Sequence, residues 1–188
     1  MQAELVSTLE VYNVLGEGVI WDHRTQTALW TDIESSLLYR WAFGKEVTHL
    51  SLPERLGSFA LSPDPNKLIC AFESGFALLN VMTGNLQWIE KINGMHKENR
   101  LNDGRVDRQG RFWSGSMNEV THGDTGVLYR LDEDGAKPIS KNIRISNGIC
   151  WNNAGNLMFF ADSPSRKIHQ FEFDPTTGQL GEPVPFAE

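Results

Sequence analysis

Basic clusters, long apolar runs and signal sequences are missing from this chain, and each absence excludes a class of function. The 17 Lys and Arg residues are scattered, the formal net charge is −7 and the pI is about 5.2. Surfaces that bind nucleic acid or anionic membranes concentrate positive charge, so we expect neither partner. No apolar run reaches the length of a membrane span, and the first ten residues, MQAELVSTLE, lack the basic and apolar regions of a signal peptide.

Cysteines and glycosylation signals are equally scarce. The chain has two cysteines, Cys70 and Cys150, no CxxC pair and no Asn-X-Ser/Thr site. Two isolated cysteines are typical of reduced, partly buried thiols. Together with the absence of a signal peptide, this predicts a cytoplasmic protein.

Apolar and aromatic residues are abundant. Of the 188 residues 40% are hydrophobic, with six Trp and ten Phe. This composition excludes a disordered chain, and the length suffices for one domain with a substantial core. Most of the Trp and Phe side chains are expected in that core.

A repeat of 40 to 45 residues organises the sequence. Four segments align, and their last residues are spaced by 40, 45 and 45 residues: Glu17–Trp21, Gly57–Leu61, Asn102–Val106 and Asn147–Trp151. Each is followed by a polar turn, a strongly apolar strand, an alternating strand ending near a glycine, and a weaker fourth strand such as Val47–Leu52 or Leu86–Ile92. No segment shows helical periodicity.

Four strands per repeat at this period predict an all-β fold, a β-propeller with about four blades. A solenoid would have shorter repeats, and a sandwich would not repeat its turns in phase. We expect one domain over residues 1–188, with blades near residues 15–55, 56–99, 100–145 and 146–188. The extra residues Asn93–Asn99 and Asn118–Thr125 break the spacing and are expected to form loops.

Both ends of the chain suggest a longer propeller. The tail Gln179–Glu188 stops where a fourth strand begins, and Leu5–Asn13 resembles an unattached strand. In many propellers such an N-terminal strand closes the last blade, so residues 1–14 are expected to do so. The open edges of an incomplete ring would favour self-association.

Three residues share one phase of the repeat. Glu17, Asn102 and Asn147 each open the first strand of a blade, beside the central channel of a propeller. One carboxylate and two amide oxygens are hard ligands suited to Ca²⁺, Mg²⁺ or Mn²⁺. The alternative is that each is an ordinary turn residue before a strand.

Around these residues the sequence resembles a known family. Leu15–Trp21, Arg100–Asp107, Gly110–Met117, Ser146–Trp151 and Ala161–Ser163 are similar to the motifs of the SMP-30/gluconolactonase/regucalcin family, in order along the whole chain. The resemblance implies a six-bladed propeller with one divalent-metal site in its channel, and hydrolysis of sugar lactones and related esters.

The resemblance also implies roles for individual residues. Glu17 and Asn147 match metal ligands, whereas Arg100 and Asn102 match residues that contact substrate and water near the metal. Glu119, on an insertion, is expected to edge the pocket. The remaining ligand, an Asp that also orients water, is expected beyond Glu188, so the catalytic residue is not among the 188.

The implied cofactor is one divalent cation, with Ca²⁺ preferred over Zn²⁺, Mg²⁺ or Mn²⁺, and the implied partner is a small-molecule sugar lactone. Without the resemblance, Arg100 could equally be a surface cation, and Asn102-Asp103-Gly104 favours a turn rather than a site. The alternative function is a non-catalytic propeller that binds calcium or other proteins.

Other chemistries find no support in the sequence. The five histidines show neither HxH nor HExxH spacing, which argues against a His-rich zinc site. There is no GxSxG nucleophile elbow, P-loop or dinucleotide fingerprint.

Overall fold

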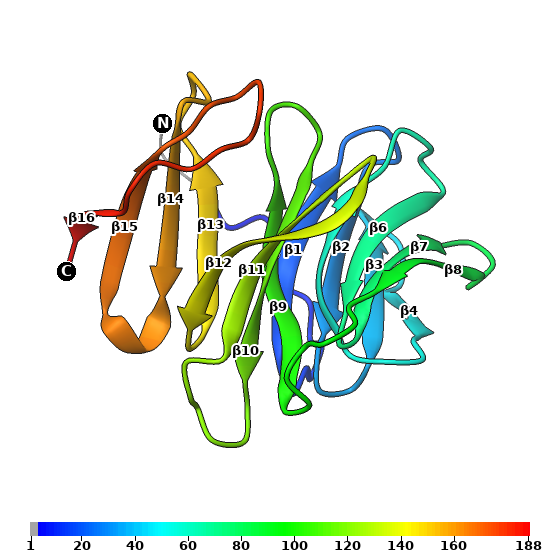
Figure 1. Cartoon of the computed structure of the whole chain (residues 1–188). Coiled ribbons are helices and arrows are strands. Elements are labelled where there is room, and N and C mark those ends of the chain that lie inside the picture. The colour runs from blue at the N-terminus through cyan, green and yellow to red at the C-terminus, as the bar shows by residue number, and fades with distance from the viewer. Residues whose placement is uncertain (1–3) are drawn as a thin grey trace.

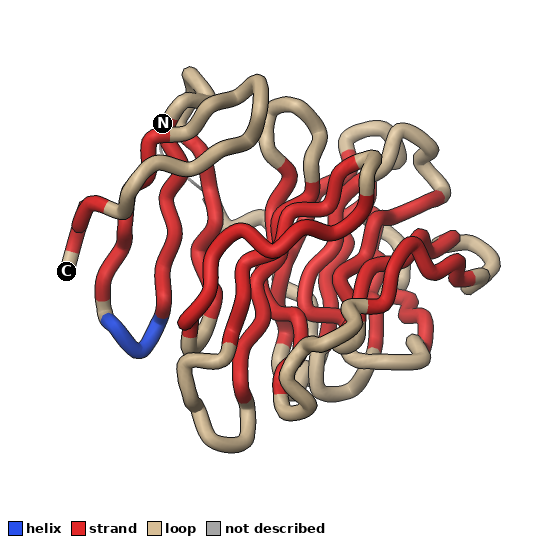
Figure 2. Tube along the Cα trace, in the orientation of Figure 1, coloured by secondary structure: helices blue, strands red, loops and turns tan. Residues whose placement is uncertain are grey.

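The structure is a computed structural model that describes residues 4–188, and its regular secondary structure consists almost entirely of β-strands (Figures 1 and 2). The strands of these residues are β1 Gly16–Asp22, β2 Thr27–Asp32, β3 Leu37–Ala42, β4 Thr48–Ser51, β5 Leu56–Leu61, β6 Lys67–Phe72, β7 Gly75–Asn80, β8 Leu86–Lys91, β9 Asn99–Val106, β10 Phe112–Asn118, β11 Gly126–Asp132, β12 Gly135–Ile143, β13 Ser146–Trp151, β14 Leu157–Asp162, β15 Lys167–Glu172 and β16 Val184–Ala187.

Each run of four consecutive strands forms its own antiparallel sheet. The order is β1-β2-β3-β4 in the first sheet, and the same meander recurs in the sheets β5–β8, β9–β12 and β13–β16. Figure 1 shows the sheets standing side by side, with β1, β9 and β13 towards the middle of the molecule. The inner strands contact one another in chain order, β1 with β5, β5 with β9, and β9 with β13. The chain is therefore an all-β propeller with four blades, as the repeat predicted.

Apolar faces hold neighbouring blades together. Three buried clusters lie at the junctions between blades 1 and 2, 2 and 3, and 3 and 4, with Phe59, Phe112 and Trp113 among their respective members. Residues 4–188 contain no corresponding cluster between blades 4 and 1. The four blades therefore form an open arc instead of a closed ring.

The N-terminal strand expected over Leu5–Asn13 is absent. None of residues 4–13 belongs to a strand, and residues 1–3 lie outside the described part. A strand needs a partner to complete its backbone hydrogen bonds, and residues 4–13 pair with none of the four sheets. Its expected role in closing the ring stays a prediction.

The connections follow the predicted pattern. Residues 92–98 and 119–125 are loops at the places where the repeat spacing breaks. A single 3₁₀ turn, Ser163–Ser165, is the one helical element of residues 4–188. Within those residues no helix is long and apolar enough to cross a membrane.

Candidate functional site

A small cavity of about 40 Å³ lies where the inner strands begin. Its lining residues come from all four blades: Leu15, Glu17, Gly18, Ile33, Gly57, Asn102, Asp103 and Asn147. The structure thus brings together Glu17, Asn102 and Asn147, which are far apart in sequence. The predicted substrate residues Arg100 and Glu119 do not line this cavity but connect to it through Asn102.

Close packing of β5 on β9 sets the width of the cavity. A Cβ atom at Gly57 would lie 2.4 Å from the carbonyl oxygen of Leu101 and 2.8 Å from that of Asn102. No other residue fits there unless the backbones move apart. Gly57, the equivalent of Glu17 and Asn147 in its blade, thus contributes space instead of a ligand.

Glu17 and Asn147 are presented by matching irregularities. The pairing register shifts after Glu17 in β1 and after Asn147 in β13. The following glycines, Gly18 and Gly148, have φ of 64° and 63°, a left-handed conformation that favours glycine. Such a β-bulge re-aims a side chain, which explains the Glu-Gly and Asn-Gly pairs in the sequence.

These two side chains have few protein partners. Both residues are exposed. The Asn147 Oδ1 accepts a hydrogen bond from the N–H of Gly148 at 3.1 Å, and its Nδ2 donates to Ser163 Oγ at 3.3 Å. The side chain of Glu17 has no hydrogen-bond or ion-pair partner among residues 4–188, so its carboxylate is free to bind a cation.

Asn102 is held rigidly from both sides of its amide group. Its Nδ2 donates to the carbonyl of Ser146 at 2.9 Å, which links β9 to β13. Its Oδ1 accepts from Nη1 of Arg100 at 2.7 Å. This fixes which amide atom is the oxygen, and that oxygen retains a second lone pair.

The prediction that Asn102-Asp103-Gly104 forms a turn is wrong. All three residues lie within β9, and the register with β10 shifts between Ser114 and Ser116. The Asp103 Oδ1 accepts from the N–H of Gly104 at 2.9 Å, and Oδ2 accepts from that of Ile149 at 3.3 Å. Asp103 therefore adds a second carboxylate to the cavity. Long-range pairing of β9 overrode the local turn preference of the sequence.

Arg100 is buried, which excludes the surface-cation interpretation. It is 3% exposed, and its Nε donates to Oε1 of Glu119. The other Glu119 oxygen lies 2.7 Å from Nη2 of Arg55, and Arg55 also donates twice to Glu73. A chain of charged hydrogen bonds thus runs from blade 2 to Asn102. Sequence reasoning missed Arg55, because nothing in the residues around it signals a partner so far along the chain.

The charged side chains of Arg55, Glu119 and Arg100 reinforce one another. Burial raises the pKa of Glu119, but the hydrogen bonds and charges of Arg100 and Arg55 outweigh it and hold the pKa below its ordinary value. The hydrogen bond to Glu73 is the main cause that raises the pKa of Arg55. Glu119 is therefore ionised and fixed between two arginines.

The donor set of the cavity fits a hard cation. Its polar side chains are two carboxylates and two amides, the oxygen ligands preferred by Ca²⁺ and Mg²⁺. A space of about 40 Å³ accommodates a single ion or water. Residues 4–188 contain no group of three or more His, Cys, Asp or Glu side chains arranged around a point. The candidate set instead depends on asparagine oxygens.

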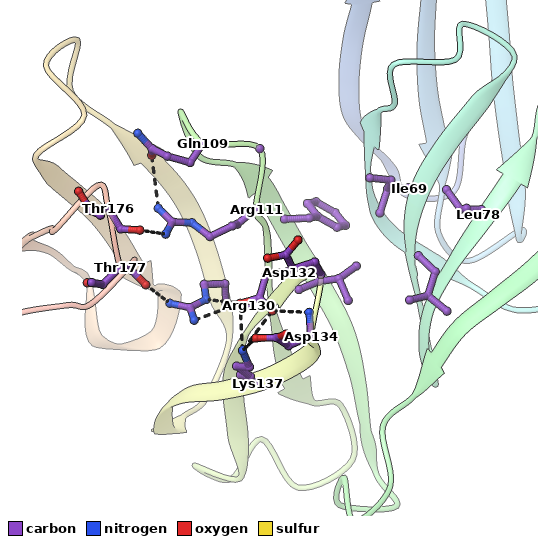
Figure 3. A pocket seen from close by; sticks show the side chains of 15 residues that line it. Ile69, Leu78, Gln109, Arg111, Arg130, Asp132, Asp134, Lys137, Thr176 and Thr177 are labelled. Carbon is purple, nitrogen blue, oxygen red and sulfur yellow. Dashed lines mark hydrogen bonds and ion pairs between the residues drawn. The ribbon is translucent and has the colours of Figure 1, made fainter.

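A larger hollow, of about 730 Å³, lies elsewhere, between the outer parts of blades 2 and 3 (Figure 3). Its cations already have partners. Arg111 and Arg130 donate to carbonyls of residues 175–178, and Lys137 pairs with Asp132 and Asp134. None of the predicted site residues lines it.

Comparison with known proteins agrees with the fold. Four four-stranded sheets arranged as blades define the chain as a β-propeller protein. The family described as SMP-30/Gluconolactonase/LRE-like region matches residues 15–188. The chain belongs to this family.

Curated relatives include lactonases and regucalcins. The chain is 34% identical to the L-arabinolactonase of Azospirillum brasilense over 191 residues, which cover 99% of this chain and 62% of that protein. It is 34% identical to the 6-deoxy-6-sulfogluconolactonase of Pseudomonas putida, covering 89% and 60% of the two chains. A solved calcium-binding protein, regucalcin, from Agrobacterium tumefaciens superposes with a TM-score of 0.88 at 27% identity, covering 94% and 60%. The chain thus spans about three fifths of the length of these relatives.

Proposed function

We propose that this chain carries most of the active site of a divalent-metal-dependent sugar lactonase. The observation that carries the proposal is the convergence of Glu17, Asn102 and Asn147 on one cavity, in a family with relatives named as lactonases. Glu17 and Asn147 are the proposed ion ligands, with Ca²⁺ the preferred ion. The proposed substrate is a small sugar lactone.

The residues around the cavity divide the chemistry between them. A bound cation would polarise the lactone carbonyl and stabilise the charge that develops on its oxygen. Asn102, immobilised by Arg100 and Ser146, orients a substrate oxygen or water at the cavity. Arg100 and Glu119 keep this arrangement rigid, and Arg100 adds positive charge beside the substrate.

Water activation requires a carboxylate. Both oxygens of Asp103 accept backbone hydrogen bonds, so this residue suits charge balance better than proton transfer. As the family resemblance implies, we propose that the water-orienting Asp lies outside residues 1–188, in a further blade of a six-bladed ring. On this proposal the 188 residues bind the ion weakly and turn over little lactone.

A non-catalytic calcium-binding propeller is the second candidate. It is favoured by the relatives named regucalcin, among them human regucalcin at 29% identity. The unpaired state of Cys70 and Cys150 agrees with a reducing compartment, and we propose the cytoplasm for either function.

The test combines binding with turnover. Calorimetric titration with Ca²⁺ should show one site in the 188-residue chain, weakened at least tenfold in Glu17→Gln, which keeps the shape but removes the charge. Glu46→Gln, in an exposed turn between β3 and β4, is the matched control.

The proposed six-bladed protein that contains this chain, here called the parent protein, should hydrolyse a 1,4- or 1,5-lactone. It should lose this activity with a chelator and regain it with the ion. Ion binding without turnover in the parent protein would favour the second candidate, and unchanged affinity in Glu17→Gln would contradict the site.

A further inference from the structure

A buried carboxylate holds the backbone just before Glu17. Asp32, at the end of β2, is 1% exposed. Its Oδ2 accepts from the N–H of Val14 and its Oδ1 from that of Leu15, both at 2.9 Å. The N–H of the next residue, Ile33, donates to the carbonyl of Leu15 at 3.0 Å. Three hydrogen bonds thus fix the backbone of Val14 and Leu15, and Leu15 lies two positions before Glu17.

Blade 4 repeats this arrangement before Asn147. Asp162, at the end of β14, accepts from the N–H of Arg144 at 3.1 Å and from that of Ile145 at 2.9 Å. The N–H of Ser163 donates to the carbonyl of Ile145 at 3.1 Å. Donors, acceptors and spacing to the candidate ligand are the same as in blade 1.

Blade 2 keeps the backbone bond but not the carboxylate. The N–H of Glu73 donates to the carbonyl of Arg55 at 2.8 Å, yet the preceding residue is Phe72. In blade 3 the backbone bond is displaced, because the N–H of Glu119 donates to the carbonyl of Glu98 at 3.3 Å, four positions before Asn102. The residue before Glu119 is Asn118, at the position of Asp32 in blade 1. The Oδ1 of Asn118 accepts instead from the N–H groups of Val120 and Thr121.

We call the aspartate that ends the second strand of a blade and accepts from two successive backbone N–H groups a carboxylate clamp, formed by Asp32 in blade 1 and Asp162 in blade 4. Within residues 4–188, this clamp occurs in the two blades that carry the candidate ion ligands.

The clamp and the bulge enclose each candidate ligand. On one side lie the three hydrogen bonds, and on the other the bulge glycine, Gly18 or Gly148. Hydrogen bonds to an ionised acceptor are about twice as strong as those between neutral groups. The backbone at Glu17 and Asn147 is consequently fixed on both sides, although both side chains are exposed.

We propose that Asp32 and Asp162 are positioning residues for the ion site, each setting the direction of one ligand through the backbone. The inference rests on the proposed function, because it assumes that Glu17 and Asn147 bind a cation. Neither aspartate touches the ion. Substitutions of groups that orient metal ligands typically lower affinity by about 10- to 100-fold.

The chain contains a matched control for a merely structural role. Asp22 lies at the opposite end of blade 1, is also 1% exposed, and accepts hydrogen bonds from the backbone and guanidinium of Arg24. Asp22→Asn should lower the melting temperature without changing the affinity for Ca²⁺. Asp32→Asn and Asp162→Asn lose the charge and one backbone acceptor, and should weaken Ca²⁺ binding about tenfold.

The experiment measures Ca²⁺ affinity by calorimetry and the melting temperature of the ion-free chain for the wild type and the three variants. Amide hydrogen exchange at Val14, Leu15 and Ile145 reports the clamps directly, and protection there should fall only in the variant of the same blade. Asp162 is less buried than Asp32, so its variant keeps the test decisive if Asp32→Asn does not fold. Equal effects of Asp22→Asn and the two clamp variants on affinity would overturn the proposal. Unchanged Ca²⁺ affinity in both clamp variants would overturn only the positioning role of Asp32 and Asp162. A wild-type chain that binds no divalent ion would overturn the metal site as well.

Discussion

The Nη2 atom of Arg55 lies 2.7 Å from Oε2 of Glu119, so a residue before β5 in blade 2 holds a residue after β10 in blade 3. The other Glu119 oxygen accepts from Arg100, which in turn fixes Asn102 at the cavity. One carboxylate therefore joins two arginines from neighbouring blades and anchors the wall of the candidate site.

Glu119→Gln should destabilise the chain, because it leaves Arg55 and Arg100 facing each other without the shared negative charge. Removing one partner of a charged hydrogen bond costs about 1–3 kcal/mol, and partial exposure of Glu119 places the expected loss near the lower end. Urea denaturation measures the free energy of unfolding. Glu133→Gln, in the exposed turn between β11 and β12, is the control and should be neutral.

Gly57→Ala should disrupt the site sterically. The new Cβ would lie 2.4 Å from the Leu101 carbonyl oxygen, which forces β5 away from β9 and displaces Asn102. Overpacking of this kind costs about 1–3 kcal/mol, observable as a lower melting temperature. At Gly123, in the loop after β10, the nearest atom would be 3.3 Å away, so Gly123→Ala should be tolerated. A stable Gly57→Ala chain would contradict the close approach of the two strands.

Asp22 should contribute to acid unfolding. The hydrogen bond from the Arg24 side chain is the main cause that lowers the pKa of Asp22 to about 2. A lowered pKa in the folded state gives stability that is fully present above the unfolded value, about 3.9, and is lost as the pH falls towards 2. Unfolding free energies measured from pH 6 to pH 2 should fall less steeply below pH 4 in Asp22→Asn than in the wild type. The control Asp124→Asn removes an exposed carboxylate and should follow the wild-type curve.

The exposed edge strand β16 should promote self-association. Val184 and Phe186 are 57% and 59% exposed, and one edge of the strand has no partner within residues 4–188. Val184→Lys places a charge on this edge and should shift the chain towards the monomer in sedimentation velocity. Val120→Lys, in an exposed loop, is the control. A monomeric wild-type chain at high concentration would contradict the prediction.

Much of the fold was readable from the sequence, because each blade is built from local hairpins. Alternating apolar residues and polar turns predicted the four strands of each blade. The breaks in the repeat spacing predicted loops at Asn93–Asn99 and Asn118–Thr125, which the structure places at residues 92–98 and 119–125. The repeat phase also predicted that Glu17, Asn102 and Asn147 would meet, since equivalent positions of a propeller surround one channel.

Pairing and packing in the folded chain fixed what the local sequence pattern did not predict. Asp103 became part of a strand because β9 pairs with β10 on both sides of an irregularity at Asn102 and Asp103, against the local preference of Asn-Asp-Gly for a turn. Leu5–Asn13 formed no strand, since β-pairing requires a partner that the local sequence does not supply.

The residues that support the site could not be predicted from the sequence either. Arg55 meets Glu119 across 64 positions of sequence, and Asp32 meets Val14 across 18, through hydrogen bonds that leave no periodic pattern. The repeat and the residues that share its phase could be predicted from the sequence, because they follow from its periodicity, and the family resemblance then implied which of them are ligands. The supporting charges were decided only by how the blades pack, since partner choice there depends on distance in space.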